Sequence, residues 1–104
     1  MSDRRRERRA ALGRMLAQER IDALLLTSLP NIRYLTGFSG TSALALATAD
    51  EIRLLTDFRY ELQVAEEVGD VATIRIEAVS LWTGLWDILG KLSTLEVIGD
   101  VAMA

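Results

Sequence analysis

The sequence predicts an α/β domain built around a mixed sheet of about five strands with helices on its faces. Short apolar runs typical of strands alternate along the chain with segments whose apolar residues recur at helical spacing. Two of the expected strands are separated by only the three residues 49–51, too few for the crossover that parallel strands need, so this pair must be antiparallel. The length of 104 residues allows one domain, and 50% of the residues are hydrophobic, enough to fill a core.

The expected elements, in chain order, are a helix over residues 3–19, a strand over 23–27, a helix from 28 to 37, strands over 42–48 and 52–56, a helix over 58–68, a strand over 73–77, a helix from 80 to 92 and a strand over 95–98. The first helix is indicated by Leu12, Met15 and Leu16, which recur at helical spacing while Arg and Glu occupy the other faces. The apolar run that follows is continuous, as in a strand covered by helices on both sides.

The second helix is marked at both ends. Ser28 followed by Pro30 is typical of a helix start, and Gly37 suits the left-handed conformation that ends many helices. The next two strands are joined by a tight turn at Ala49-Asp50-Glu51, which predicts an antiparallel hairpin.

The third helix is expected to be capped by Asp57 and to carry Phe58, Leu62 and Ala65 on one face. Residues 73–77 then alternate strictly between polar and apolar side chains, which predicts a strand with one face in water.

The last helix is expected to be capped by Ser80. Its apolar face is formed by Leu81, Leu85, Ile88, Leu89 and Leu92. Trp82 and Trp86 lie four residues apart and widen this face beyond what a one-sided contact needs. A place in the core is the favoured interpretation of the two tryptophans, and the alternative is an exposed aromatic contact with another domain or subunit.

The composition excludes several kinds of active site. The chain has no His and no Cys, so it cannot build a Ser-His-Asp triad, a Cys-His dyad or an ordinary zinc site. Lys91 is the only lysine, which leaves carboxylate chemistry or a Lys/Ser pair. The aspartates form no pattern that indicates a metal site. The lack of cysteine fits the cytoplasm, and no apolar stretch approaches the ~20 residues of a membrane helix.

The charge is distributed unevenly. Residues 1–20 contain seven Arg and three acids, a balance of +4, whereas the five bases and twelve acids of the remainder give −7. An arginine-rich end can bind nucleic acid or an acidic surface. We favour a solvated outer face of the first helix, because the acidic remainder would repel a polyanion, and we expect neither a nucleic acid nor a membrane as partner.

Two polar segments are candidate sites. The glycine-rich loop of residues 37–42 could cradle phosphate, but it lacks the lysine of a P-loop, so a closely packed connection from helix to strand is favoured. The second segment contains Asp57, Arg59 and Tyr60. Asp57 is favoured as a helix cap. Arg59 either pairs with Asp57 or Glu61, or joins Tyr60 in a contact with a carboxylate or a partner.

Three segments taken together resemble a known family. They are residues 21–27 (IDALLLT), 31–38 (NIRYLTGF) and 55–60 (LTDFRY). Their order and separation resemble the N-terminal domain of Xaa-Pro peptidases, the group of prolidase, aminopeptidase P and creatinase. The resemblance extends over essentially the whole chain and implies a three-layer α/β domain with a mixed sheet.

In that family this domain precedes a pita-bread catalytic domain, which holds two divalent metal ions, usually Mn, Co or Zn. The resemblance therefore implies that residues 1–104 are a single N-terminal domain without the catalytic domain, and that this chain has no catalytic residue, metal or other cofactor of its own. The chain stops directly after an apolar strand, at Val101-Ala102-Met103-Ala104, so we expect a truncation.

The resemblance also implies a non-catalytic role with two parts. The domain helps to form a homodimer, and it forms part of the rim of the site that binds a proline-containing peptide. That site belongs to the catalytic domain of the same subunit or of the partner subunit. Carried onto this sequence, the contact candidates are Tyr34, Phe38 and the loop from Ser39 to Ser42, followed by Arg59 and Tyr60, although these positions could equally serve the domain's own packing. The alternative is a stand-alone interaction module that kept the fold without the enzyme and uses Trp82 and Trp86.

Overall fold

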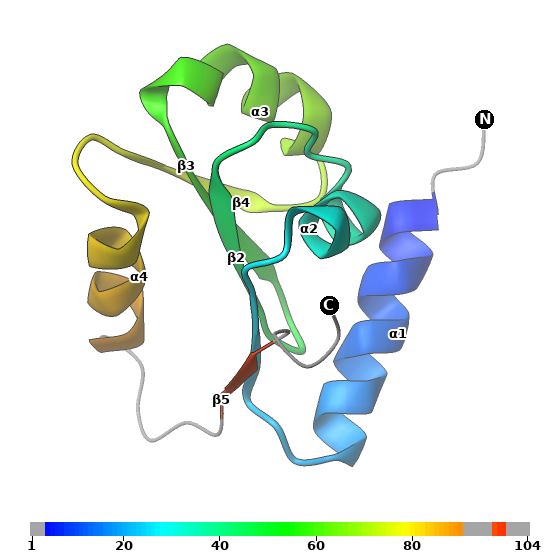
Figure 1. The fold of residues 1–104 in the computed structure, drawn as a ribbon. Helices are drawn as coiled ribbons and strands as arrows, with labels where there is room; N and C mark the ends of the chain where they lie inside the picture. Colours follow the sequence, from blue (N-terminus) through cyan, green and yellow to red (C-terminus); the bar gives the residue numbers. More distant parts are fainter. Residues whose placement is uncertain (1–3, 91–96, 100–104) are drawn as a thin grey trace.

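The computed structural model describes residues 4–90 and 97–99 and contains one five-stranded sheet with the order β4-β3-β2-β1-β5 (Figure 1). The strands are β1 (Ala23–Leu26), β2 (Ala43–Ala47), β3 (Ile52–Asp57), β4 (Thr73–Glu77) and β5 (Val97–Gly99). The helices are α1 (Arg4–Gln18), α2 (Leu29–Thr36), the 3-10 helix η1 (Phe58–Tyr60), α3 (Glu61–Val68) and α4 (Leu81–Gly90). The predicted α/β class and element order are confirmed, while Leu92 and residues 95–96 lie outside the described residues.

The sheet is mixed, as predicted. Strand β2 is antiparallel to both β1 and β3, whereas β4 is parallel to β3 and β5 is parallel to β1. The turn of the β2–β3 hairpin is closed by Thr48, whose N–H donates to the Glu51 carbonyl at 2.8 Å. The predicted antiparallel hairpin is therefore confirmed.

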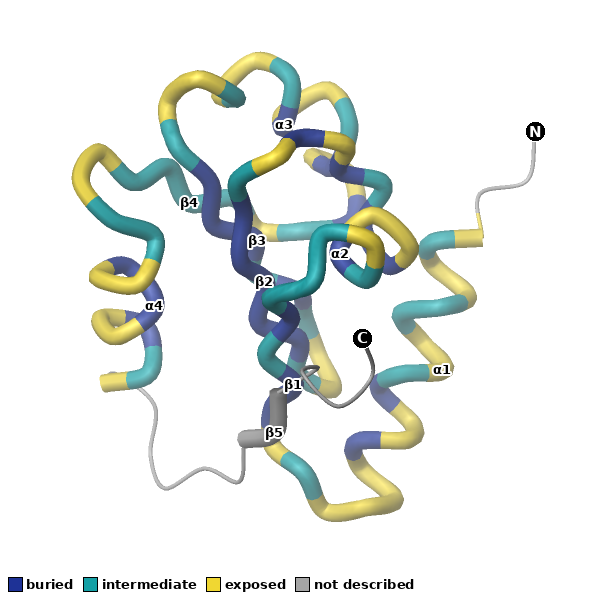
Figure 2. Tube along the Cα trace, in the orientation of Figure 1, coloured by how far each residue is buried: buried dark blue, intermediate teal, exposed yellow. Residues whose placement is uncertain are grey.

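Helices cover the two faces of the sheet unequally, which gives three layers. Helices α1, α2 and α3 pack on the face that carries Leu24, Leu26 and Ala45. Helix α4 packs on the other face, where Leu44 and Leu46 lie. Figure 2 shows the buried central strands between helices whose outer sides are exposed. None of the helices in the described ranges has the length and apolarity that a bilayer crossing requires.

The ends of α2 follow the predicted pattern. Pro30 lies in its first turn, and Gly37 caps its C-terminus at φ 85° with its N–H donating to the Arg33 carbonyl. A residue with a Cβ would be strained in this left-handed conformation, which explains the glycine.

The packed face of α3 differs from the apolar face expected from the sequence. Val64 and Val68 are fully buried, whereas Phe58 and Leu62 are 67% and 82% exposed. Val64 and Val68 are four residues apart and share one face of α3, and this face packs on the sheet, whereas Leu62 lies on another face of the same helix. The expectation of one continuous helix with Phe58 and Leu62 on its packed face is therefore wrong.

Three arginines of α1 bind the rest of the domain, so the expectation of a purely solvated face is wrong for them. Arg5 donates to the carbonyls of Thr36 and Glu67 and pairs with Asp70 at 2.9 Å. Arg8 donates to the Tyr34 carbonyl at 2.8 Å, and Arg9 donates to the Asp50 carbonyl. The long guanidinium side chains reach carbonyls that the ends of helices and turns leave without a helical partner.

The outer face of α4 carries both tryptophans. Leu85 and Ile88 are buried against the sheet, whereas Trp82 is 46% and Trp86 is 64% exposed. Their rings face each other with centroids 6.5 Å apart. The favoured core placement of the tryptophans is therefore wrong, because the leucine and isoleucine positions alone fill the contact with the sheet.

Candidate functional site

Most of the candidate residues gather at one end of the sheet, where β1 and β3 end and β2 begins. The strand register places Ala43 of β2 opposite Thr56 of β3, and Ala45 opposite Leu26 of β1. The loop of residues 37–42 and η1 therefore lie beside each other at this end (Figure 1).

The loop 37–42 is held partly by its own core contacts. The buried Thr36 hydroxyl donates to the Ile32 carbonyl at 2.6 Å and accepts from the Phe38 N–H at 3.1 Å. Gly40 lies so close to the Phe38 ring that a Cβ there would be 2.2 Å from Phe38 Cζ. The closely packed connection predicted for this loop is confirmed. The burial of Phe38, at 1% exposed, favours its packing role over the contact role.

A carboxylate from α3 holds the exposed part of the same loop. Ser39 donates to Glu67 through its N–H at 3.0 Å and through its hydroxyl at 2.6 Å. Gln63 donates to both the Ser39 hydroxyl and the Glu67 carboxylate. Burial raises the pKa of Glu67, but the hydrogen bonds from Ser39 and Gln63 and the charge of Arg33 outweigh it, so the pKa lies below its ordinary value.

Asp57 and Arg59 form a bidentate pair at the start of η1. The Asp57 carboxylate accepts from the Arg59 N–H at 3.0 Å, from Nε at 2.9 Å and from Nη2 at 2.8 Å. The hydrogen bond from the Arg59 side chain is the main cause that lowers the pKa of Asp57 to about 2. The expected cap at Asp57 is confirmed. Asp57 and Glu61 were the two possible ion-pair partners of Arg59, and the structure shows Asp57.

Tyr60 connects η1 to the loop 37–42. Its hydroxyl lies 2.6 Å from the Thr41 hydroxyl, and this hydrogen bond lowers the pKa of Tyr60. Its ring meets the edge of Phe38 at 90° with centroids 5.6 Å apart, and the Arg59 guanidinium lies 5.3 Å from its centroid. The structure thus brings together Phe38, Ser39, Arg59 and Tyr60.

Two adjoining hollows open at this end of the sheet. One has a volume of about 480 Å³ and is lined by Leu29, Thr41, Tyr34 and Ser39 among others. The other has a volume of about 360 Å³ and includes Leu29, Thr41, Ser42 and Trp82. Because they share Leu29 and Thr41, the hollows form one surface with Tyr34 near one end and Trp82 at the other. Trp86 lines neither hollow.

Glu67 and Gln63 are site residues that sequence reasoning missed. The sequence pattern indicates only that Glu67 lies off the apolar face of the third helix. Its bond to Ser39 spans 28 residues, so no local spacing signals it. Only the packing of α3 beside the loop brings the two side chains together.

The described residues do not fit the two-metal centre that the resemblance places in the catalytic domain. Within residues 4–90 and 97–99, no group of three or more His, Cys, Asp or Glu side chains could hold a metal ion. The groups that the structure places at the sheet end are the aromatic ring of Tyr60, the hydroxyl groups of Ser39 and Thr41 and the guanidinium of Arg59.

Comparison with known proteins gives consistent matches. The family model described as the creatinase/prolidase N-terminal domain matches residues 8–102. The uncharacterized peptidase YqhT of Bacillus subtilis (strain 168) is 42% identical over 57 residues, which are 55% of this chain and 16% of that peptidase. The chain therefore matches less than a fifth of the length of this curated relative.

Solved structures agree with this match. The creatinase/prolidase-like N-terminal domain from Corynebacterium diphtheriae is 36% identical with a TM-score of 0.74, over 88% of this chain and 71% of that one. Aminopeptidase P of Streptococcus thermophilus is also 36% identical, with a TM-score of 0.70 over 92% of this chain and 71% of that one. The chain thus belongs to the creatinase/prolidase N-terminal domain family, and it is homologous to the N-terminal domains of Xaa-Pro peptidases.

Proposed function

We propose that this chain serves as the non-catalytic N-terminal domain of an Xaa-Pro dipeptidase or aminopeptidase P-type metallopeptidase. In this role it contributes to a homodimer and forms part of the rim of the substrate site, where a proline-containing peptide binds beside a catalytic domain. The metal ions and the bond cleavage belong to that catalytic domain. The lack of cysteine supports a cytoplasmic location.

One observation carries the rim assignment, namely the pair of adjoining hollows at the end of the sheet. The exposed groups that line them are Tyr34, Ser39, Thr41 and Trp82. With the half-buried Tyr60, whose hydroxyl is hydrogen-bonded to Thr41, and the adjacent Arg59, they form what we call the rim surface. Within this surface, Arg59 is held by Asp57, Ser39 by Glu67, and Thr41 by Tyr60. A preorganised surface of aromatic and hydroxyl groups is suited to contact a peptide without losing much conformational entropy.

The test uses the protein as it is made in its own cells, first to determine its intact mass and then to measure hydrolysis of Xaa-Pro peptides. A mass well above 11.5 kDa together with Xaa-Pro cleavage is expected. The 104-residue chain alone should show no cleavage.

The rim assignment is tested by a matched pair of tryptophan variants in that active protein. We expect Trp82→Ala to raise KM for a proline-containing peptide about fivefold with kcat little changed. The reason is that the lost contact would stabilise the bound substrate and the transition state equally. Trp86→Ala, which removes an exposed tryptophan outside the hollows, should leave KM unchanged. Identical kinetics for both variants and the unmodified protein would contradict the rim assignment.

The exposure of Trp82 and Trp86 also supports the alternative of a stand-alone interaction module. This function would give an intact mass of 11.5 kDa, no cleavage of any Xaa-Pro peptide, and equal loss of partner binding in the two tryptophan variants.

A further inference from the structure

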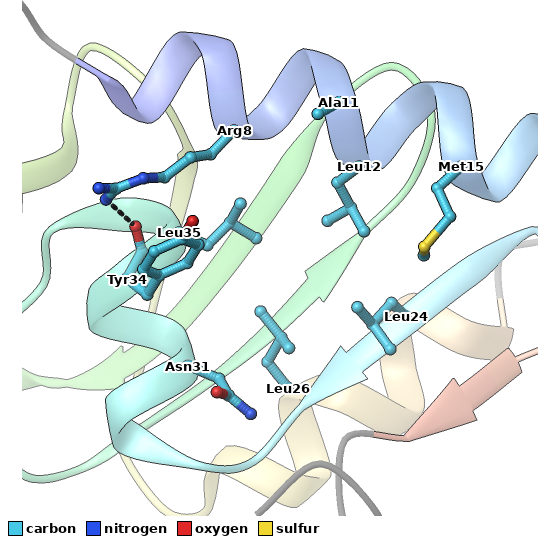
Figure 3. Close-up of a pocket in the computed structure, with 9 residues that line it drawn as sticks. All are labelled: Arg8, Ala11, Leu12, Met15, Leu24, Leu26, Asn31, Tyr34 and Leu35. Carbon is cyan, nitrogen blue, oxygen red and sulfur yellow. Dashed lines mark hydrogen bonds between the residues drawn. The ribbon is translucent and has the colours of Figure 1, made fainter.

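An apolar groove lies between α1 and α2, on the face of the sheet opposite to α4. It has a volume of about 330 Å³, and its walls include Ala11, Leu12, Met15, Leu24, Leu26 and Tyr34 (Figure 3). Met15 is 42% exposed and Tyr34 is 61% exposed, so the apolar surface continues out of the groove. Exposed apolar surface of this kind is typical of an interaction site.

One end of the groove is basic. Arg8 lies over the Tyr34 ring at 4.0 Å from its centroid and donates to the Tyr34 carbonyl at 2.8 Å. Figure 3 shows Arg8 and Tyr34 together at one end, with Met15 at the other. Arg4 is exposed one turn earlier on the same side of α1. An occupant of the groove should therefore combine apolar side chains with acidic groups.

The outer face of α3 has this combination. Phe58 of η1, which directly precedes α3, and Leu62 of α3 are exposed apolar residues, and Glu61 and Glu66 of α3 are exposed beside them. In the part of the chain that the structure describes, the salt bridges involve neither of these two glutamates. The result is an apolar ridge with acidic residues next to it.

We infer that the groove between α1 and α2 receives the outer face of α3 from a second copy of this chain. The inference rests on the homodimer of the proposed function and names its interface. Helices α1, α2 and α3 cover the same face of the sheet, so two copies related by a two-fold axis can make this contact twice, groove to ridge and ridge to groove.

Charge determines which surfaces meet. Two copies of α1 would bring arginines together, and two copies of α3 would bring glutamates together, whereas the crossed arrangement pairs Arg8 with Glu61 or Glu66. Opposite charges at an interface favour the correct pairing and oppose the two like-charged ones.

The experiment is sedimentation equilibrium of the protein over a range of concentrations. We expect a mass twice that of the single chain for the unmodified protein. Leu62→Glu should shift it to the single-chain mass, because it places a charge on the apolar ridge. Val79→Glu is the matched control, since Val79 is 94% exposed and lies outside both surfaces.

A charge exchange tests the pairing itself. Arg8→Glu, and separately Glu61→Arg combined with Glu66→Arg, should each weaken the dimer at least about tenfold in Kd. Combining all three substitutions should restore Kd to within about threefold of the unmodified value.

A dimer that persists in Leu62→Glu, or a triple variant that binds no more tightly than Arg8→Glu or the double Glu61→Arg/Glu66→Arg variant, would overturn this interface while leaving the homodimer itself in place. An unmodified protein that is monomeric at all concentrations would overturn both the interface and the homodimer. The rim assignment is judged separately by the kinetics of Trp82→Ala, because Trp82 lies on α4, on the opposite face of the sheet.

Discussion

Ser39 and Glu67 are joined by two hydrogen bonds, from the Ser39 N–H at 3.0 Å and from its hydroxyl at 2.6 Å, although they lie 28 residues apart in the sequence. This bond connects the loop after α2 to α3 and holds one side of the larger hollow. It makes the geometry of the rim surface depend on a side chain that does not itself line the hollow.

Removal of this carboxylate should loosen the loop without unfolding the domain. We expect Glu67→Ala to lower the free energy of unfolding by about 1 kcal/mol, because three partly exposed hydrogen bonds to a charged group, two from Ser39 and one from Gln63, are lost. Hydrogen exchange at the Ser39 amide should accelerate. Glu19→Ala removes an exposed glutamate outside the loop and outside the proposed dimer surfaces, and should change neither quantity. Slow exchange at Ser39 in the Glu67→Ala protein would contradict the role assigned to this bond.

The Asp57–Arg59 pair should make stability depend on pH. The pKa of Asp57 is about 2 in the folded protein, against an ordinary value of 3.8. Because the folded-state pKa is depressed, the stabilisation is present above the ordinary value and is lost as the pH falls through the folded one. The free energy of unfolding should therefore decrease between about pH 4 and pH 2.

Urea titrations across this range provide the measurement. The decrease should be smaller in Asp57→Asn, which has no charge to lose, and unchanged in Val79→Ala, which alters an exposed side chain outside both proposed surfaces. A pH dependence that is identical in Asp57→Asn and the unmodified protein would show that the pair does not stabilise the fold.

The packed face of α3 can be tested with two identical substitutions. Val68 is fully buried and Val79 is 94% exposed. Val68→Ala should lower the free energy of unfolding by about 2 kcal/mol, because buried methyl groups are lost and a cavity remains. Val79→Ala should change it by less than about 0.5 kcal/mol. The free energy of unfolding of both proteins is measured by chemical denaturation. Equal values for the two variants would contradict the packing of Val68 against the sheet.

The sequence alone determined the class of fold and the order of the elements, because the signals for them are local. Gly37 can take up a left-handed conformation that other residues avoid, and a turn of three residues permits only an antiparallel hairpin. The cap at Asp57 is equally local, since it joins a side chain to the N–H two residues later. For the same reason, short motifs were sufficient to reveal the resemblance to Xaa-Pro peptidases.

Only the tertiary structure decided which side chains are exposed and which distant ones meet. Apolar residues occur on two faces of α3, and only the packing decided that Val64 and Val68 reach the sheet while Phe58 and Leu62 stay outside. The same holds for Trp82 and Trp86, since the sheet accepts only one face of α4. The bonds of Arg5 and Glu67 join segments far apart in the chain, so they depend on the packing of α1 and α3 and have no counterpart in local sequence.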